Sequence, residues 1–310
     1  MFSDSEISLK KMAATASIGT ALVLCVIKAV AAFYTGSLSV LSSMIDSLSD
    51  VVSSMVTFVA VKIADKPLTD RHRYGYGKAE CVSALVQAAF IVGSAAFILY
   101  DGVQRFMYPM PMQQTTTGII IMLISLAITF LLIAFQNYVV KKTKSKAIAA
   151  DSMHYVVDIL SNSAVILSLA VVHFWHWEWF DILTAVLIAV YLIFNAYKIT
   201  IDALGEITDA EVEPAIKEDI LKMVRNADGV LGCHDFRSRV SGARMFIELH
   251  LELDGNATLF VVHDITENVE QLIKNRFPQA EIIIHQDPHG INEYRLDHQL
   301  SGANGGLPFA

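Results

Sequence analysis

Hydrophobic residues form long, nearly uninterrupted segments over the first 205 residues of the chain. A helix that crosses a lipid bilayer needs about 20 consecutive apolar residues. Five segments reach that length, namely Ala13–Tyr34, Ala79–Tyr100, Thr117–Val140, Ala147–Phe174 and Trp177–Ile201. A sixth segment, Ser37–Ala64, is rich in serine and more polar, so we expect a helix that its neighbours shield from lipid. The pattern predicts six transmembrane helices within residues 1–205.

The pattern changes near Gly205 to one that is typical of a soluble domain. Alternating positions predict strands, and apolar positions with a helical period predict amphipathic helices. We expect helices over 211–226 and 259–277, and strands over 232–240, 245–253 and 281–286. The order α-β-β-α-β predicts a small cytoplasmic α/β domain over residues 206–289. Residues 290–310 have little periodicity, and we expect them to form a disordered tail.

The composition agrees with a membrane protein. The chain has 310 residues, of which 54% are hydrophobic and only 17% are charged, whereas soluble domains carry about 25% charged residues. The net charge of −8 argues against nucleic-acid binding. Three scattered cysteines do not suggest a disulfide framework.

Lysine and arginine placement predicts the orientation, because cytoplasmic loops carry an excess of these residues. The loop after the second segment and the loop after the fourth are both rich in them, with Lys62, Lys66, Arg71, Arg73 and Lys78 in the first and Lys141, Lys142, Lys144 and Lys146 in the second. Both chain termini are therefore expected on the cytoplasmic side.

Four potential metal ligands lie inside two of the hydrophobic segments. Asp46 and Asp50 are spaced i, i+4, and so are His154 and Asp158, so each pair lies on one face of its helix. Ionisable residues at membrane depth are costly and mark ion pathways by default. Carboxylates with one imidazole suit a divalent transition metal. A buried aspartate hydrogen-bonded to a serine is the alternative for any one of these residues, but two matched pairs favour a metal path.

The charges of this site also suggest proton exchange. Three carboxylates around a dication leave a charge of about −1, which a protonated histidine offsets once the metal has left. Metal and proton would then compete for one site, because metal affinity depends on pH. Such competition is what an antiporter requires.

A second group of potential ligands lies in the predicted soluble domain. Its members are His234, His250, His263, His285 and Asp287. His285 and Asp287 are spaced i, i+2 and share one face of their strand. Imidazole with carboxylate suits zinc or a similar ion, and a shared carboxylate could bridge two metals. The alternative is a set of solvated surface histidines. Cys233 precedes His234, and for it a place in the core is favoured over a role as a soft ligand.

These residues resemble the cation diffusion facilitator family, and in particular its bacterial zinc and iron efflux members. The resemblance is carried by the two ligand pairs, by Arg-Tyr-Gly-Tyr-Gly-Lys-Ala-Glu at 73–80 and by Ile-Ile-His-Gln-Asp-Pro at 283–288. It implies Zn²⁺/H⁺ antiport by alternating access in a homodimer of the cell inner membrane, with Cd²⁺ and Fe²⁺ as further candidate substrates. The histidine of the second pair resembles the zinc- and cadmium-handling branch more than the manganese branch.

The resemblance also implies roles for particular residues. Asp46, Asp50, His154 and Asp158 match the transport site of the family. The five residues of the soluble group match a binuclear cytoplasmic site at the dimer interface, in which His250 and Asp287 serve both metals. Lys78 and Asp209 match a charge pair between protomers near the membrane surface.

The loop after the second segment departs from the family pattern. Close relatives carry an aspartate and two histidines there as a metal site, whereas this chain has Thr69 and Tyr76 at two of those positions. His72 remains in register, with Asp70 beside it. We therefore predict that this loop site is weak or absent.

Two other classes of function were weighed against a metal exporter. An intramembrane metalloenzyme would leave one position on its zinc open for water, but four ligands fill the shell here and no general base is evident beside them. A membrane-anchored metal sensor would not require six spans with buried charges. The sequence therefore predicts a transporter and not an enzyme.

Overall fold

The chain divides into two compact units. The computed structural model describes residues 4–35, 38–107, 116–175 and 179–291, together with residues 295 and 297. The first unit extends to Gly205 and the second begins at Glu206. We consider each unit by itself.

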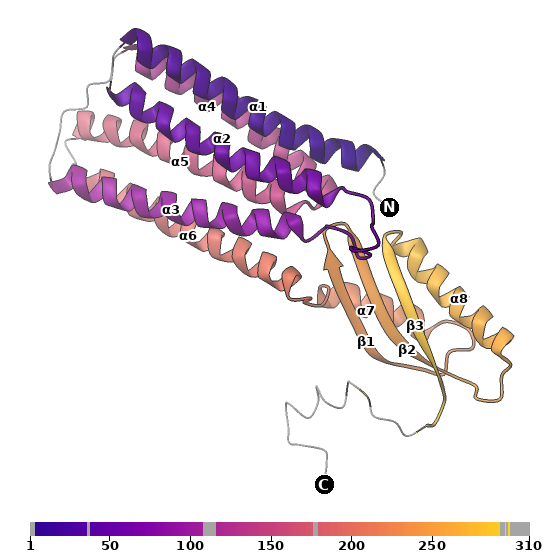
Figure 1. Cartoon of the computed structure of the whole chain (residues 1–310). Helices are drawn as coiled ribbons and strands as arrows, with labels where there is room; N and C mark the ends of the chain where they lie inside the picture. Colours follow the sequence, from indigo (N-terminus) through magenta and orange to yellow (C-terminus); the bar gives the residue numbers. More distant parts are fainter. Residues whose placement is uncertain are drawn as a thin grey trace. The chain divides into compact units, whose positions relative to one another are not determined.

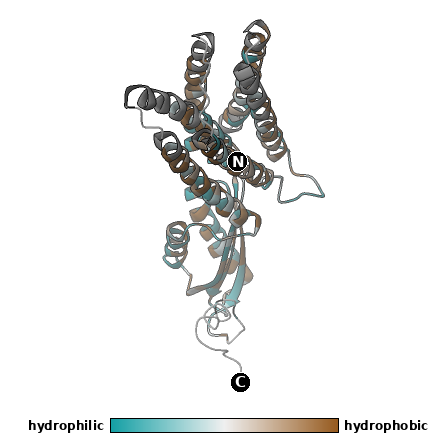
Figure 2. Cartoon of the chain, turned by 90° about the vertical axis from the view of Figure 1, so that its left-hand side faces the viewer, coloured by the Kyte–Doolittle hydropathy of each residue, from teal (hydrophilic) through white to brown (hydrophobic). Residues whose placement is uncertain are grey.

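Long helices make up the described part of the first unit (Figure 1). They are α1 (Asp4–Thr35), α2 (Leu38–Ala64), α3 (Ala79–Met107), α4 (Thr116–Thr143), α5 (Lys146–Trp175) and α6 (Trp179–Ile207). Among the described residues, α1, α3, α4 and α6 each contain a stretch long and apolar enough to cross a membrane. Hydrophobic residues predominate along these helices (Figure 2). The predicted helical membrane region is confirmed, and α2 and α5, whose side chains are only partly described, are also long helices.

Small side chains let the helices of this unit approach one another, as is common in membrane bundles. Ala88 and Ala95 of α3 pack with Val157 of α5 and with Ala189 and Leu192 of α6. A second cluster joins α1, α2, α4 and α5 through Ala13, Ala14, Val61, Val139, Ala147 and Ile148. The helix that carries His154 and Asp158 therefore packs in both clusters.

The prediction that the serine-rich helix is shielded proves half right. Its polar stripe is buried, with Ser53, Ser54 and Thr57 facing the other helices. Its opposite face carries Leu48, Val52, Met55 and Val59, which are exposed in the single chain. The prediction overlooked these residues, which repeat at steps of three and four and so form an apolar face that the helices of one chain leave uncovered.

The second unit is a three-stranded sheet covered on one face by two helices (Figure 1). Its elements are α7 (Pro214–Arg225), β1 (Gly232–Ser241), β2 (Arg244–Leu253), α8 (Leu259–Arg276) and β3 (Ala280–Pro288). The predicted α-β-β-α-β order is confirmed. Strand β2 lies in the centre, antiparallel to β1 and parallel to β3.

The alternation along β2 decides which face of the sheet is covered. Ile247, Leu249, Leu251 and Leu253 are buried in a core with Ile220 and Val224 of α7 and Val269 and Ile273 of α8. The residues between them lie on the opposite face, because successive side chains of a strand alternate. This second face carries His250 and Glu252, and no helix of the second unit's described part packs on it.

Replacing Ile247 with alanine should destabilise the second unit by about 3 kcal/mol, because the residue is fully buried and the change leaves a cavity. Amide exchange of β2 should then be about a hundredfold faster, measured by hydrogen exchange and mass spectrometry on the solubilised full chain. Ile283→Ala on β3 is the matched control, since that side chain is 59% exposed. Equal effects of the two changes would contradict the assignment of faces.

Candidate metal sites

Three of the four predicted membrane ligands converge in the first unit. One ligand atom from each of Asp50, His154 and Asp158 lies within 4.8 Å of the others. His154 Nε2 is 3.3 Å from Asp50 Oδ1, which joins α2 to α5. Asp46 lies on α2 one turn before Asp50, but its side chain is outside the described part of the structure. The i, i+4 spacing on two facing helices therefore gathers a ligand set that the chain separates by about a hundred residues.

The surroundings of His154 suit a metal ligand. Its side chain is almost fully buried, with Phe90 and Tyr155 edge-on to the imidazole at ring-centroid distances of 6.3 and 5.9 Å. Its Nδ1 atom is buried and has no hydrogen-bond partner among the described residues. Buried nitrogen atoms are normally hydrogen-bonded, so the unpaired Nδ1 indicates a place for an additional partner, while Nε2 faces Asp50. The donor set of two carboxylates and an imidazole fits a divalent transition metal.

Three histidines form a row across the open face of the sheet in the second unit. His234 lies opposite His250 in the β1–β2 register, and His250 lies opposite His285 in the β2–β3 register. Their neighbouring rings are 5.1 and 4.7 Å apart between centroids. Side chains that are paired across adjacent strands lie on one face and close together. The sheet register therefore assembles the ligands that the sequence separates.

Asp287 contacts all three histidines. Its Oδ2 atom is 2.8 Å from His250 Nδ1 and 3.5 Å from His234 Nε2, and its Oδ1 atom is 3.1 Å from His285 Nε2. The carboxylate is 6% exposed although the face around it is open. One carboxylate with an oxygen toward each side of the row has the geometry that a ligand shared by two metals requires.

His263 does not join the other four residues in the single chain. It is exposed on α8 and lies 3.4 Å from Glu267, one helical turn away. The clusters of potential ligands among the described residues do not include it. Its predicted role at a dimer interface requires a second chain and stays a prediction.

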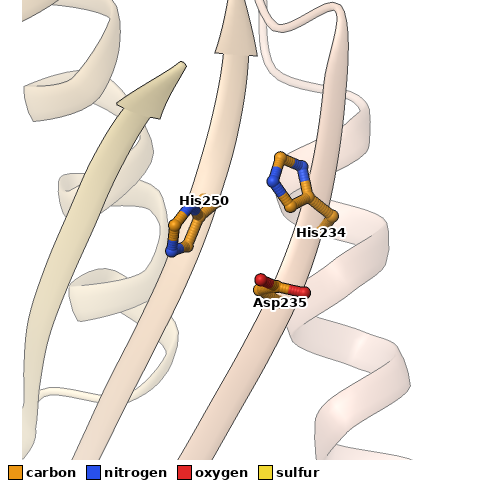
Figure 3. Close-up of side chains that lie close together, drawn as sticks. All are labelled: His234, Asp235 and His250. Atoms are coloured by element: carbon orange, nitrogen blue, oxygen red, sulfur yellow. The ribbon is translucent and has the colours of Figure 1, made fainter. Parts of the chain in front are cut away.

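Asp235 is a potential ligand that sequence reasoning missed. Figure 3 shows it beside His234 on β1, with His250 on the neighbouring β2, and the three offer ligand atoms within 4.8 Å of one another. Consecutive residues of a regular strand point to opposite faces. Here the register shifts between His234 and Arg237, and Asp235 has a φ of 50°. The bulge places both side chains at the site, and no feature of the sequence indicates it.

Glu252 and His289 extend the row on the same face, and strand alternation could have predicted both. Glu252 Oε1 is 3.2 Å from His234 Nδ1, and Glu252 Oε2 is 2.7 Å from His289 Nδ1. A carboxylate on the far nitrogen of a ligating histidine fixes the orientation of its ring. Burial acts to raise the pKa of Glu252, but the hydrogen bond with His289 and the nearby Arg295 outweigh it, so the pKa is lowered overall. Gly232 leaves room for this carboxylate, because a Cβ there would lie 2.9 Å from Glu252 Cδ.

Two residues of the predicted tail contact this end of the sheet. Arg295 Nη2 is 2.8 Å from Glu252 Oε1, and Asp297 exchanges two hydrogen bonds with Asp235 at 2.9 and 3.0 Å. The remaining residues after Ile291 lie outside the described part, so the prediction of disorder is not tested there.

Cys233 packs against the core of the second unit, and burial raises its pKa to about 11, which favours the predicted structural role.

In the loop between α2 and α3, the residues at which the sequence departs from the expected pattern contact one another. Thr69 Oγ1 lies 3.2 Å from the Tyr76 hydroxyl, and His72 stacks on the Tyr76 ring at 4.4 Å. Neither Asp70 nor His72 belongs to a cluster of three potential ligands among the described residues. These contacts support the prediction of a weak or absent loop site.

Asp209 lies 3.5 Å from Arg239 within its own unit, and its predicted pairing with Lys78 of a second chain is not tested.

Comparison with known proteins gives the same two-part division. A family model of the cation efflux transmembrane domain matches residues 14–208, and one of the cation efflux protein cytoplasmic domain matches residues 212–289. The chain belongs to the cation efflux family. It is therefore a membrane transporter of cations and not an enzyme.

Similar proteins include cation-efflux pumps named FieF. The one from Citrobacter koseri is 39% identical over 90% of this chain and 93% of its own length. The one from Shewanella oneidensis is 40% identical over 90% of this chain and 94% of its own. Among solved structures, the zinc form of CzrB matches with a TM-score of 0.25 and 27% identity, covering 28% of this chain and 99% of that one. The metal-bound C-terminal domain of CzcD from Thermotoga maritima matches with a TM-score of 0.25 and 26% identity, covering 26% of this chain and all of that one.

Asp287→Asn should weaken zinc binding to the second unit by about 10- to 100-fold or more, since even groups outside the ligand shell are worth that much. The measurement is calorimetric titration of the solubilised full chain carrying Asp50→Ala, so that the membrane site does not contribute. Glu281→Gln is the matched control, because it is exposed on the same face of β3. If the histidines are solvated surface residues without a metal site, Asp287→Asn and Glu281→Gln should have the same zinc affinity.

When Asp50→Ala and Asp287→Asn impair the other two sites, we expect no zinc to bind at the loop between α2 and α3. The reason is that the His72 ring is stacked on Tyr76. Equilibrium dialysis against zinc is the measurement. Residual binding that disappears when His72→Ala is added would show that the loop site exists.

Proposed function

We propose that this protein exports Zn²⁺ in exchange for protons, with Cd²⁺ and Fe²⁺ as further substrates. The observation that carries the proposal is the cluster of Asp50, His154 and Asp158 between α2 and α5. Acidic residues within a helical membrane unit are expensive unless they serve a pathway. The similarity to efflux pumps named FieF supports metal as the cargo.

Proton exchange follows from the chemistry of the same cluster. The imidazole of His154 lies within reach of two carboxylates, so a proton on it is stabilised when no metal is present. A metal ion must displace that proton, because both need the imidazole lone pair. Metal arriving from the cytoplasm would release the proton, and protons arriving from the opposite side would release the metal. Alternating access of one site to the two sides couples both fluxes.

The second unit supports a role in regulation or in holding two chains together. Its histidine row lies on a face that the helices of the unit leave open. His263 is exposed on α8 and belongs to no cluster of potential ligands among the described residues of its own chain, so we assign it to the metal site of a second chain. We propose a homodimer in which metal bound to the second unit stabilises the assembly when cytosolic metal rises.

The proposed setting is the cell inner membrane, with both termini in the cytoplasm. The positively charged loops that support this orientation are the segment 62–78 and the connection from α4 to α5. The second unit follows α6 and would then lie in the cytoplasm, where it can sense the metal that is to be exported.

Asp50→Ala should abolish exchange of zinc for protons. Loss of one ligand should lower zinc flux by about a hundredfold or more. The measurement is zinc flux into proteoliposomes that enclose a pH-sensitive dye, with wild type and mutant compared at equal protein incorporation. Asp202→Asn on α6 is the matched control, because that side chain is exposed and away from the ligand cluster.

The outcomes separate the transporter from a sensor. Zinc flux opposite to proton flux, lost in Asp50→Ala and kept in Asp202→Asn, is the expected result. Zinc binding without any flux in the wild type would favour a membrane-anchored sensor. Retained flux in Asp50→Ala would refute the assignment of the transport site.

A further inference from the structure

A second buried acid lies one helical turn before His154 on α5. Asp151 has no solvent exposure in the structure, and none of the three clusters of potential metal ligands among the described residues includes it. Polar side chains from the four preceding helices converge on it or on its partners: Ser17 of α1, Ser54 and Thr57 of α2, Gln87 of α3 and Gln136 of α4. An ionisable residue at this depth without an assigned role is a candidate for function.

The hydrogen bonds to Asp151 come from neutral groups. Its Oδ2 atom accepts from Ser17 Oγ and from Gln136 Nε2, both at 2.6 Å. Its Oδ1 atom accepts from Thr57 Oγ1 at 3.3 Å and from Gln87 Nε2 at 3.5 Å. Burial favours the protonated acid, whereas four donors favour the carboxylate. These opposing effects leave the protonation of Asp151 sensitive to any charge that changes nearby.

The nearest changing charge is the transport site. The titratable groups that face Asp151 are His154 and Tyr155, both on α5, and His154 acts on it electrostatically. The described side chains that contact it from α1, α2, α3 and α4 are all hydroxyls or amides. A dication bound at His154 would favour the carboxylate of Asp151, and removal of the dication would favour the acid.

The neighbouring hydroxyls can accommodate either form. Ser17 Oγ is 2.9 Å from Ser54 Oγ, and Ser54 Oγ is 2.7 Å from the Tyr155 hydroxyl, where either atom can donate. A hydroxyl both donates and accepts. The hydrogen bonds that link Ser17, Ser54 and Tyr155 can therefore reverse their donor–acceptor direction when Asp151 gains a proton. Ser17 would then accept from the acid and donate to Ser54. A site lined only by amide donors could not adjust in this way.

We propose that Asp151 is a second proton-binding group of the transport cycle, separate from the metal ligands. It releases its proton to bulk water when metal enters the site at Asp50, His154 and Asp158, and it takes up a proton when the metal leaves. Each cycle then returns one more proton than the metal ligands alone account for. This inference rests on the proposed function, because it assumes that metal and protons exchange.

The test counts the protons that zinc displaces. Wild type and Asp151→Asn are solubilised as full chains that also carry Asp287→Asn, which weakens the second unit's site, and zinc is kept below the concentration that this weakened site binds. Zinc is added at fixed pH in weak buffer with a pH-sensitive dye. Asparagine keeps the shape and one acceptor oxygen but binds no proton. We expect zinc to bind still, with up to one proton fewer released per zinc and a shallower dependence of zinc affinity on pH. Unchanged proton release and pH dependence would overturn the proposal.

Two further variants keep the test decisive if Asp151→Asn does not fold. Asp151→Glu retains a carboxyl group and should restore proton release, whereas a structural role that depends on side-chain length would not be rescued. Gln136→Leu removes one donor that favours the carboxylate, so half-maximal proton release should move to higher pH. An unchanged midpoint in Gln136→Leu counts against the proposal.

Failure of this inference is distinguishable from failure of the proposed function. If wild-type proteoliposomes exchange zinc for protons and Asp151→Asn releases as many protons as wild type, only the role of Asp151 is refuted. If the wild type moves zinc without moving protons, the antiport itself is refuted, whatever Asp151→Asn does.

Discussion

The structure depends on holding carboxylates inside a bundle of apolar helices. An acid buried without partners is strongly disfavoured, so the fully buried Asp151 requires polar partners from several helices. The serine and threonine stripe of α2 and the glutamines of α3 and α4 provide these partners, directly or through one another. Alanines at the helix contacts bring the backbones close enough for such short side chains to meet. The metal cluster and the buried acid beside it are consequences of one packing arrangement.

The two units solve the same coordination problem in different surroundings. In the helical unit His154 is buried and the two carboxylates beside it, Asp50 and Asp158, are partly buried, so charge on a metal or proton has large effects on its neighbours. In the second unit the histidine row lies on the uncovered face of a sheet, and a single carboxylate, Asp287, contacts three imidazoles.

The loop between α2 and α3 is held together by contacts among its own side chains. Thr69 Oγ1 pairs with the Tyr76 hydroxyl, and the Tyr76 ring stacks on His72. These contacts occupy the residues for which the sequence predicts a weak or absent metal site.

Periodicity alone determined most of this protein. Apolar runs predicted the helical membrane region, alternation predicted the three strands, and the i, i+4 spacing of acids and histidine predicted the ligands that converge. These features are local, because the repeat of a helix or strand fixes which residues share a face.

Tertiary structure decided the rest. Asp235 joins the site through a bulge with a φ of 50°, and Asp151 gains its importance from side chains on four other helices. The contact of Arg295 with Glu252 also depends on which segments pack together. Contacts between distant segments leave no periodic signal, so no spacing in the sequence could have shown them.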